Sequence, residues 1–249
     1  MNITGNTIFI PGATSGIGLA LARRLKSRGN TVIVGGRRAE VLDELRDQGF
    51  GAVRIDTSDP QSITDAAAQV IAEYPDLNCL VTMAGVMLPE DWHTPEGFLE
   101  TAEHTVTTNL LGPIRLIAAF IQQLQSLPEA TIITVSSGLA SVPLSRTPTY
   151  CASKAAIHSL SEAIRLQLAD SSVQVIELVP PAVRTGLGDT SRNPRAVPLD
   201  DFADDVITLL ETEPDAHEIL VEQVKFQRYA ERRGEYDTAV AVINGGARS

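Results

Sequence analysis

The sequence predicts a doubly wound α/β fold, with a seven-stranded parallel sheet and helices on both of its faces. Three observations predict it. Short apolar segments alternate with longer amphipathic ones along the chain. The segments NCLVTMAG and VQVIELV are apolar at consecutive positions, as strands that helices cover on both faces require. A glycine-rich turn joins the first apolar segment to a helical pattern and then to a second strand, which makes a β-α-β unit.

The expected elements alternate in the order that this fold needs. Strands are expected near residues 7–11, 31–35, 52–56, 78–82, 130–135, 173–179 and 218–222. Helices are expected near residues 17–28, 39–48, 61–73, 98–126, 150–169 and 200–212. Ligands of such sheets bind outside the carboxyl ends of the strands, so the residues that follow each strand are the first candidates for a site.

Length and composition indicate one catalytic unit. A chain of 249 residues that is 43% hydrophobic can bury one large core, so residues 1–249 are expected to form a single domain. No apolar run approaches the ~20 residues that span a bilayer, and no basic region precedes the first apolar stretch, so no membrane helix or signal peptide is expected. Only Cys79 and Cys151 are present, which favours a reducing compartment over a disulfide framework. We therefore expect a cytoplasmic protein.

Charge and histidine placement exclude several classes of partner. The net charge of −11 repels polyanions, so neither nucleic acid nor an anionic membrane is an expected partner. The histidines His93, His104, His158 and His217 are scattered without metal-ligand spacing, and no cysteine pair or carboxylate cluster joins them in the sequence. We therefore expect no metal site.

The first turn, Gly12-Ala13-Thr14-Ser15-Gly16-Ile17-Gly18, has the form of a phosphate-binding turn. Gly12 can turn the chain sharply as it leaves the strand, Gly16 lets backbone approach a pyrophosphate, and Gly18 lets the helix lie close to the sheet. The N-terminus of that helix then offers free N–H groups and a partial positive charge to an anion. A glycine pattern alone is weak evidence, but a strand and a helix flank this one as the mechanism requires.

Arg37 and Arg38 follow the second strand, where an acidic residue would normally face the ribose hydroxyls of NAD. A guanidinium can instead pair with the 2′-phosphate of NADP through charge-assisted hydrogen bonds. This pattern favours NADP(H) over NAD(H). The alternative is that both arginines are solvated residues in the first turn of the next helix.

Tyr150 and Lys154 lie one helical turn apart on a predicted helix, and Ser137 ends the apolar segment TIITVSS upstream of them. A free tyrosine titrates near pH ~10, and a neighbouring cation favours its charged form. We therefore expect Lys154 to lower the pKa of Tyr150, so that this phenol can exchange a proton with a substrate alcohol or carbonyl. The pair alone could also arise by chance on an amphipathic helix.

Together these residues resemble the short-chain dehydrogenase/reductase superfamily, a single-domain Rossmann-type fold. The glycine turn matches its TGxxxGIG motif, and Val179-Pro180-Pro181-Ala182-Val183-Arg184-Thr185 is similar to its nicotinamide loop. The resemblance implies these catalytic residues: Asn109, Ser137, Tyr150 and Lys154. It implies these residues at the cofactor: Gly12, Thr14, Ser15, Gly16, Ile17, Gly18, Arg37, Arg38, Asp56, Thr57, Ala84, Gly85, Tyr150, Lys154, Pro180, Val183 and Thr185.

The resemblance also assigns a role to Asn109, which in relatives opens a kink in the long helix and holds a water that links the lysine to solvent. Here Asn109 could instead be a polar position in a buried helix. Asp56, expected beside the adenine, could equally cap the following helix, although Ser58 or Asp59 is better placed to do so.

Three positions depart from the family pattern. Pro11 replaces a threonine, Thr82-Met83-Ala84-Gly85 replaces NNAG, and Pro181 replaces a glycine of the nicotinamide loop. The first two remove side-chain hydrogen bonds that brace the cofactor loop and the central strand in relatives. The block SSGLASVPLSRTPTYCASKAAIHS, together with ELVPP, most resembles a bacterial subgroup associated with teichoic-acid D-alanylation genes. This association is genomic context and identifies no substrate.

The expected activity is hydride transfer between NADP(H) and a carbonyl or secondary alcohol. Residues 183–200 are expected to form a substrate-side loop, and the expected apolar lining of the pocket is Met87, Leu139, Val142, Leu144 and Leu187. Relatives pair through their long helices, so a homodimer or homotetramer is expected here through 98–126 and 150–169.

Two alternative functions remain open. The chain could be an NAD(P)H-binding redox sensor or scaffold with little turnover, or an epimerase or dehydratase. Relatives of the latter kind usually carry a further substrate domain, for which 249 residues leave little room.

Overall fold

The structure is a computed structural model, and it describes residues 1–245 apart from the side chains of Asp189 and Arg192. Residues 246–249 of the expected single domain lie outside the described part. Seven parallel strands form one sheet in the order β3-β2-β1-β4-β5-β6-β7, which confirms the predicted fold class. The strands are β1 Thr7–Pro11, β2 Thr31–Gly36, β3 Gly51–Arg54, β4 Cys79–Thr82, β5 Ala130–Val135, β6 Val173–Leu178 and β7 Glu218–Ile219.

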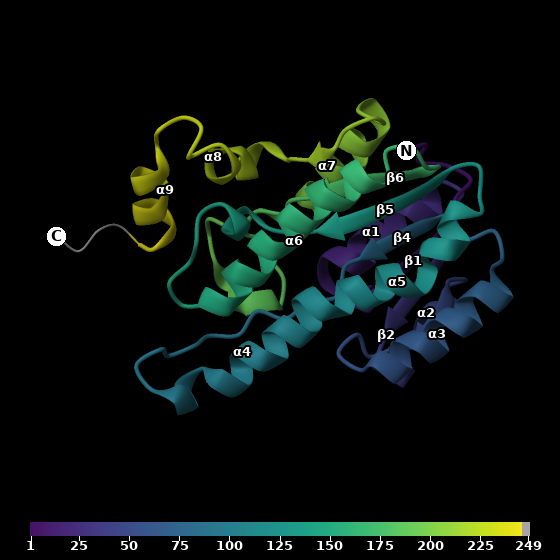
Figure 1. Ribbon diagram of the computed structural model, residues 1–249, viewed down its shortest axis with the longest axis horizontal. Coiled ribbons are helices and arrows are strands. Elements are labelled where there is room, and N and C mark those ends of the chain that lie inside the picture. The colour runs from purple at the N-terminus through teal and green to yellow at the C-terminus, as the bar shows by residue number, and fades with distance from the viewer. Residues whose placement is uncertain (246–249) are drawn as a thin grey trace.

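Helices cover both faces of this sheet (Figure 1). One face packs against α1 Gly16–Ser27, α2 Ala39–Asp47 and α7 Leu199–Thr212. The opposite face packs against α3 Pro60–Glu73, α5 Gly112–Gln125 and α6 Pro148–Gln167. The strands of the central sheet are buried on both sides, which explains why their sequences are apolar at consecutive positions.

The long helix expected over residues 98–126 is divided into three parts. The α-helix α4 Leu99–Val106 is followed by a π-helical turn, Thr107–Leu111, and then by α5. Pro113 has no N–H, so it cannot donate to the carbonyl of Asn109, and the Gly112 N–H instead reaches back to the carbonyl of Thr107. The expected helical span is therefore present over residues 99–125, and a π-helical turn lies at Asn109, where the resemblance implies a kink.

The C-terminal region also differs from the expectation. The segment KFQRYAERRGEYD forms the short helix α8 Lys225–Arg228 and the start of α9 Tyr236–Ile243. Gln227 and Ala230 are buried rather than solvated. The expected strand at 218–222 is only Glu218–Ile219, because its continuation turns into a short 3₁₀ segment, Glu222–Val224.

Other boundaries agree closely with the sequence pattern. Asp59 caps α3 by accepting a hydrogen bond from the Gln61 N–H, as its position before Pro60 predicted. Asp200 and Asp201 lie in the first turn of α7, but neither side chain caps it. Asp200 and Asp204 instead form ion pairs with Arg24 of α1. Among residues 1–245, no helix combines the length and apolar character that a bilayer crossing requires.

Candidate active site

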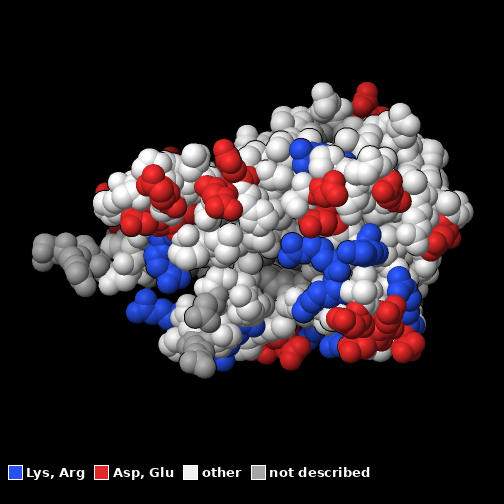
Figure 2. All heavy atoms as spheres, turned by 90° about the horizontal axis from the view of Figure 1, so that it is seen from below, with Lys and Arg blue, Asp and Glu red and all other residues white. Residues whose placement is uncertain are grey.

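A cleft of about 1190 Å³ lies along the carboxyl ends of the strands. The turns after β1, β3, β4 and β6 line it, together with the ends of β2 and β5 and the start of α6. Every residue expected at the cofactor lines this cleft, as do Ser137, Tyr150 and Lys154, whereas Asn109 lies behind its wall. The underside of the molecule is hollowed near its centre, with basic side chains beside the hollow, although acidic residues outnumber basic ones in the chain (Figure 2).

The glycine turn brings backbone to the floor of the cleft. Gly12 has a φ of 92°, and a Cβ atom at this position would lie 2.7 Å from the Cα atom of Ala84. A Cβ at Gly18 would lie 2.6 Å from the carbonyl oxygen of Gly12, so helix α1 can start this close to β1 only with glycine there. Ser15 precedes α1 without a side-chain capping bond, and no acidic residue lies in the first turn. The N-terminal N–H groups of α1 are therefore available to an anion.

Arg37 and Arg38 line the adjoining part of the cleft. Arg38 Nη2 donates to both the carbonyl and the hydroxyl oxygen of Thr14, at 3.0 Å each. Arg37 Nη1 lies 3.8 Å from Asp56 Oδ2, and the Arg37 side chain is mostly exposed. Burial opposes the charge on Asp56, but hydrogen bonds from Ser58 and the nearby Arg37 hold its pKa below the usual value. The guanidinium groups of Arg37 and Arg38 and the carboxylate of Asp56 thus lie where the end of β2 meets the turn after β3.

The turn after β4 is braced by Asn109. Its Oδ1 accepts from the Val86 N–H at 2.8 Å, and its Nδ2 donates to the Val86 carbonyl at 2.8 Å. Asn109 is fully buried in the π-helical turn, so the alternative of a merely polar position in a regular helix does not describe it. Thr82, which stands where relatives have asparagine, is buried, and its hydroxyl has no partner among residues 1–245. Met83 instead packs into the apolar cluster beneath α1.

Ser137, Tyr150 and Lys154 meet at the inner end of the cleft, where all three are largely buried. Ser137 follows β5 and accepts a hydrogen bond from the Leu139 N–H, which holds it at the start of a 3₁₀ turn, Gly138–Ala140. Lys154 Nζ lies 5.7 Å from the centre of the Tyr150 ring and donates to the Val135 carbonyl at 2.7 Å. The sequence spacing therefore places the phenol and the ammonium on one face of α6.

The pKa of Tyr150 differs from the expectation. Burial raises it to about 12, a hydrogen bond with Ser137 opposes this rise, and Lys154 is not among the groups that shift it. The expected acidification by Lys154 is absent, because its ammonium is directed to the Val135 carbonyl, and desolvation dominates the shift. Burial also lowers the pKa of Lys154 to about 8, and Glu177 opposes that change. The phenol therefore keeps its proton at neutral pH.

The segment expected to form a substrate-side loop, residues 183–200, folds back on itself. Val183 pairs with Val197 in a short parallel bridge, and both side chains are buried. Residues Leu187–Arg192 form a 3₁₀ turn rather than an open loop. Met87 contacts this turn, because its sulfur lies 2.8 Å from where a Cβ of Gly188 would be. Pro180 accepts a hydrogen bond from the Gly138 N–H, which joins the loops after β5 and β6.

Four of the five expected apolar lining residues border the cleft, namely Met87, Leu139, Leu144 and Leu187. Val142 does not. It is fully buried against Ala230 and Ala239, because the C-terminal segment covers the loop that carries it.

That C-terminal segment contributes residues which the sequence pattern did not indicate. Gln227 and Asn244 line the cleft. Gln227 is almost fully buried, and its Oε1 lies 2.6 Å from where a Cβ of Gly138 would be. Asn244 accepts a hydrogen bond from the Ser145 N–H at 2.8 Å. No motif marks these positions, since they reach the cleft only through the path of the chain after β7.

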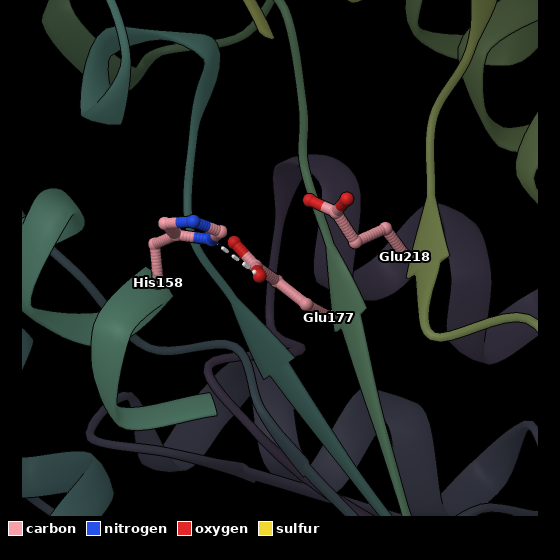
Figure 3. Close-up of side chains that lie close together, drawn as sticks. All are labelled: His158, Glu177 and Glu218. Carbon is pink, nitrogen blue, oxygen red and sulfur yellow. Dashed lines mark hydrogen bonds and ion pairs between the residues drawn. The ribbon is translucent and has the colours of Figure 1, made fainter. Parts of the chain in front are cut away.

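A second cluster of charges lies behind the catalytic helix. One ring nitrogen of His158 and one carboxylate oxygen each of Glu177 and Glu218 lie within 4.8 Å of one another (Figure 3). The sequence pattern indicated no carboxylate cluster joined to a histidine. The three residues come from α6, β6 and β7, so only the sheet order brings them together. Arg228 Nε donates to Glu218 Oε1 at 2.6 Å, and its Nη2 lies 3.3 Å from His158 Nε2. The guanidinium thus supplies the positive charge that the carboxylates require.

Comparison with known proteins places this site in a family. A family model for short chain dehydrogenase matches residues 6–196. An uncharacterised oxidoreductase of Bacillus subtilis, DltE, is 42% identical over 197 residues, or 78% of this chain and 77% of the relative, and it confirms the predicted subgroup.

Two solved structures are similar over nearly their whole length. A short chain dehydrogenase from Burkholderia cenocepacia in complex with NADP is 27% identical, with a TM-score of 0.79 over 96% of this chain and 99% of that one. A short chain dehydrogenase/reductase from Burkholderia phymatum in complex with NAD is 20% identical, with a TM-score of 0.82 over 100% and 99% of the chains, and shows the likeness of fold. The chain therefore belongs to the short-chain dehydrogenase family of NAD(P)-dependent oxidoreductases.

Proposed function

We propose that this protein is an NADP-dependent oxidoreductase that transfers hydride between the nicotinamide and a carbonyl or secondary alcohol, with Tyr150 as the general acid and base. One observation carries the proposal. The glycine turn, the two arginines after β2 and the Ser137, Tyr150 and Lys154 side chains all line a single cleft. Residues for binding a dinucleotide and residues for moving a proton thus border the same space.

The residues of the cleft fit a dinucleotide. Gly12 and Gly18 have no Cβ atoms, so the backbone of the glycine turn can pack closely. The first turn of α1 offers unpaired N–H groups to a pyrophosphate. Thr14, Ser15, Gly16 and Ile17 would hold the phosphates, and Asp56 and Thr57 the adenine. Ala84, Gly85, Pro180, Val183 and Thr185 would hold the nicotinamide half.

NADPH, when bound, supplies the hydride, and the chain supplies the proton. Ser137 donates a hydrogen bond to the substrate oxygen, and the Tyr150 hydroxyl gives its proton to that oxygen as the carbonyl carbon is reduced to an alcohol. A general acid must carry its proton, and the Tyr150 phenol is protonated at neutral pH. With the cofactor bound, the Lys154 ammonium would hold the ribose hydroxyls and the phenol oxygen in place of the Val135 carbonyl that it binds in this structure. Asn109 keeps the loop at Val86 in place beside it.

Arg37 and Arg38 support a preference for NADP. Both line the cleft at the end of β2, and Arg38 is already held against Thr14 of the phosphate turn. A 2′-phosphate there would gain charge-assisted hydrogen bonds from these guanidinium groups. An NADP enzyme usually runs as a reductase, because the cellular pool of this cofactor is mainly reduced, and we assign that direction.

The substrate is proposed to be neutral. Met87, Leu139, Leu144 and Leu187 give the inner cleft apolar surface, and the segment 183–200 covers the substrate side. Residues 1–249 are proposed to act as one cytoplasmic catalytic domain. We also propose a homodimer or homotetramer, because Leu99, Val106 and Ile114 expose apolar surface on α4 and α5, and Leu166 does so on α6.

The experiment is a turnover assay with a matched pair of tyrosine variants. Purified protein is mixed with NADPH or NADH and a panel of ketones, aldehydes and quinones, and the loss of the near-ultraviolet absorbance of the reduced nicotinamide is followed. Tyr150→Phe removes one hydroxyl group, so turnover should fall by ~10²- to 10⁴-fold, while NADPH affinity changes little. Tyr74→Phe makes the same change outside the cleft and should leave turnover intact.

Each outcome separates the candidate functions. Turnover by Tyr150→Phe within about tenfold of the wild-type rate would refute the role of the phenol. NADPH binding by the wild-type protein with no turnover on any substrate would favour the redox sensor or scaffold. Absence of binding to either cofactor would refute the proposal entirely.

A further inference from the structure

Lys154 and His158 lie one turn apart on the face of α6 that packs against β5 and β6. Lys154 is buried, and its Nζ donates to the Val135 carbonyl at the end of β5. His158 lies over β6, where its Nδ1 and Glu177 Oε2 are 2.8 Å apart (Figure 3). Glu177 is 1% exposed, so a carboxylate side chain lies inside the molecule directly behind the proposed catalytic helix.

Within residues 1–245, the Glu177 carboxylate uses only one of its two oxygens in hydrogen bonds. The second oxygen, Oε1, is buried and has no hydrogen-bond partner among the residues that the structure describes. The remaining members of the cluster satisfy one another on the outer side, where Arg228 binds Glu218, and Glu162 lies 3.9 Å from His158 Nε2. In the register of the sheet, Glu177 lies opposite Thr134, the residue before Val135, whose carbonyl accepts from Lys154 Nζ. The carboxylate whose Oε1 lacks a partner in the described part of the chain therefore lies on the strand beside the point where the Lys154 ammonium is bound.

Lys154 is a buried cation that needs a nearby negative charge. Burial lowers its pKa to about 8, and Glu177 is the one charged group that opposes this effect. Tyr150, on the same face of α6, is protonated at neutral pH and supplies no charge. The titratable groups of α4, Glu100, Glu103 and His104, are exposed, and the π-helical turn contributes the neutral Asn109. Desolvation of an ammonium is costly, and a buried opposite charge is what offsets it.

We infer that Glu177 is a positioning residue of the hydride-transfer site, whose buried carboxylate keeps the Lys154 side chain in its ammonium form. Glu177 acts through Lys154 and does not line the cleft. His158 orients the carboxylate by holding Oε2, which leaves Oε1 as the oxygen without a partner. The inference rests on the proposed function, since the ammonium matters to turnover only if Lys154 holds the cofactor and the phenol.

The ionisation of Lys154 can be measured directly, because the chain has only three lysines, Lys26, Lys154 and Lys225. Protein grown with isotopically labelled lysine gives three side-chain resonances in NMR, and Lys154→Met identifies the one from Lys154. Glu177→Gln keeps the shape of the side chain and removes its charge. The titration midpoint of Lys154 should fall by about one pH unit or more, as expected for the loss of a nearby opposite charge. The resonances of Lys26 and Lys225 should titrate as in the wild type.

Two further variants control for charge and for structure. Glu162→Gln removes an exposed carboxylate beside the same histidine and should leave the Lys154 midpoint unchanged. Glu177→Asp keeps the charge but withdraws it by one methylene group, so its midpoint should lie between those of the wild type and Glu177→Gln. If Glu177→Gln does not fold, Glu177→Asp provides the test, and a wild-type midpoint in it would overturn the inference.

A second readout connects the ionisation to function. NADPH affinity should fall as pH rises through the Lys154 midpoint, and in Glu177→Gln this fall should begin at a pH lower by the same amount. An unchanged midpoint in folded Glu177→Gln would overturn the inference. A shifted midpoint in a protein that binds neither NADPH nor NADH would instead refute the proposed function and leave the electrostatic coupling standing.

Discussion

The buried ammonium of Lys154 should lower the stability of the folded protein in a way that depends on pH. Lys154→Met replaces the cation with an apolar side chain of similar length, and so removes the cost of burying a charge. It also removes the hydrogen bond to the Val135 carbonyl, which costs a fixed amount at every pH. The pH-dependent part of the difference between the two proteins therefore reports how far the pKa of Lys154 differs between the folded and unfolded chains.

The size of this effect follows from the pKa. Burial moves the pKa of Lys154 from 10.5 to about 8, and at ~1.36 kcal/mol per unit this is ~3 kcal/mol. Between these two values the unfolded chain holds a proton on Lys154 that the folded chain has lost, so the stability of the wild type rises with pH in this window. Below pH ~8 the full penalty is present, and above pH ~10.5 it is gone.

The assay is urea unfolding of the wild type and Lys154→Met at several values between about pH 7 and about pH 10. The free energy of unfolding of the wild type, minus that of the variant, should increase by roughly 2.5 kcal/mol across this range. All other titrating groups are common to both proteins and cancel in the difference. A difference that stays constant within about 0.5 kcal/mol would refute the reasoning, because Lys154 would then titrate alike in the folded and unfolded chains.

Two further predictions concern the ends of the cleft. Arg38→Ala should weaken NADPH binding by roughly tenfold or more, since a hydrogen bond to a charged group contributes ~1.5–3 kcal/mol. The same variant should leave NADH binding unchanged. Equal losses for both cofactors in fluorescence titrations would contradict a 2′-phosphate site. Gln227→Leu should lower kcat/KM for carbonyl substrates with polar substituents without changing NADPH affinity, because the side chain lines the cleft beside Gly138. If the order of kcat/KM values across the substrate panel is unchanged, Gln227 does not contact the substrate.

The sequence alone determined the sheet, its order of elements and most of the site. Apolar runs and a glycine turn predict parallel strands and a phosphate site because both patterns are local, and the structure places those residues at one edge of the sheet. The spacing of Tyr150 and Lys154 places both on one face of a helix for the same reason. Local sequence also contains the cause of the helix break at Asn109, since Pro113 lacks the required N–H, although the pattern was interpreted as one helix.

Only the tertiary structure decided which charges are buried together. His158, Glu177 and Glu218 are far apart in the sequence, and they meet because α6, β6 and β7 are neighbours in space. Solvent exclusion likewise decides the direction of the Tyr150 shift, because the desolvation of a phenol depends on everything packed around it and not on the neighbour one turn away. Gln227 reaches the cleft by the path of the chain after β7, which no periodic pattern in the sequence encodes.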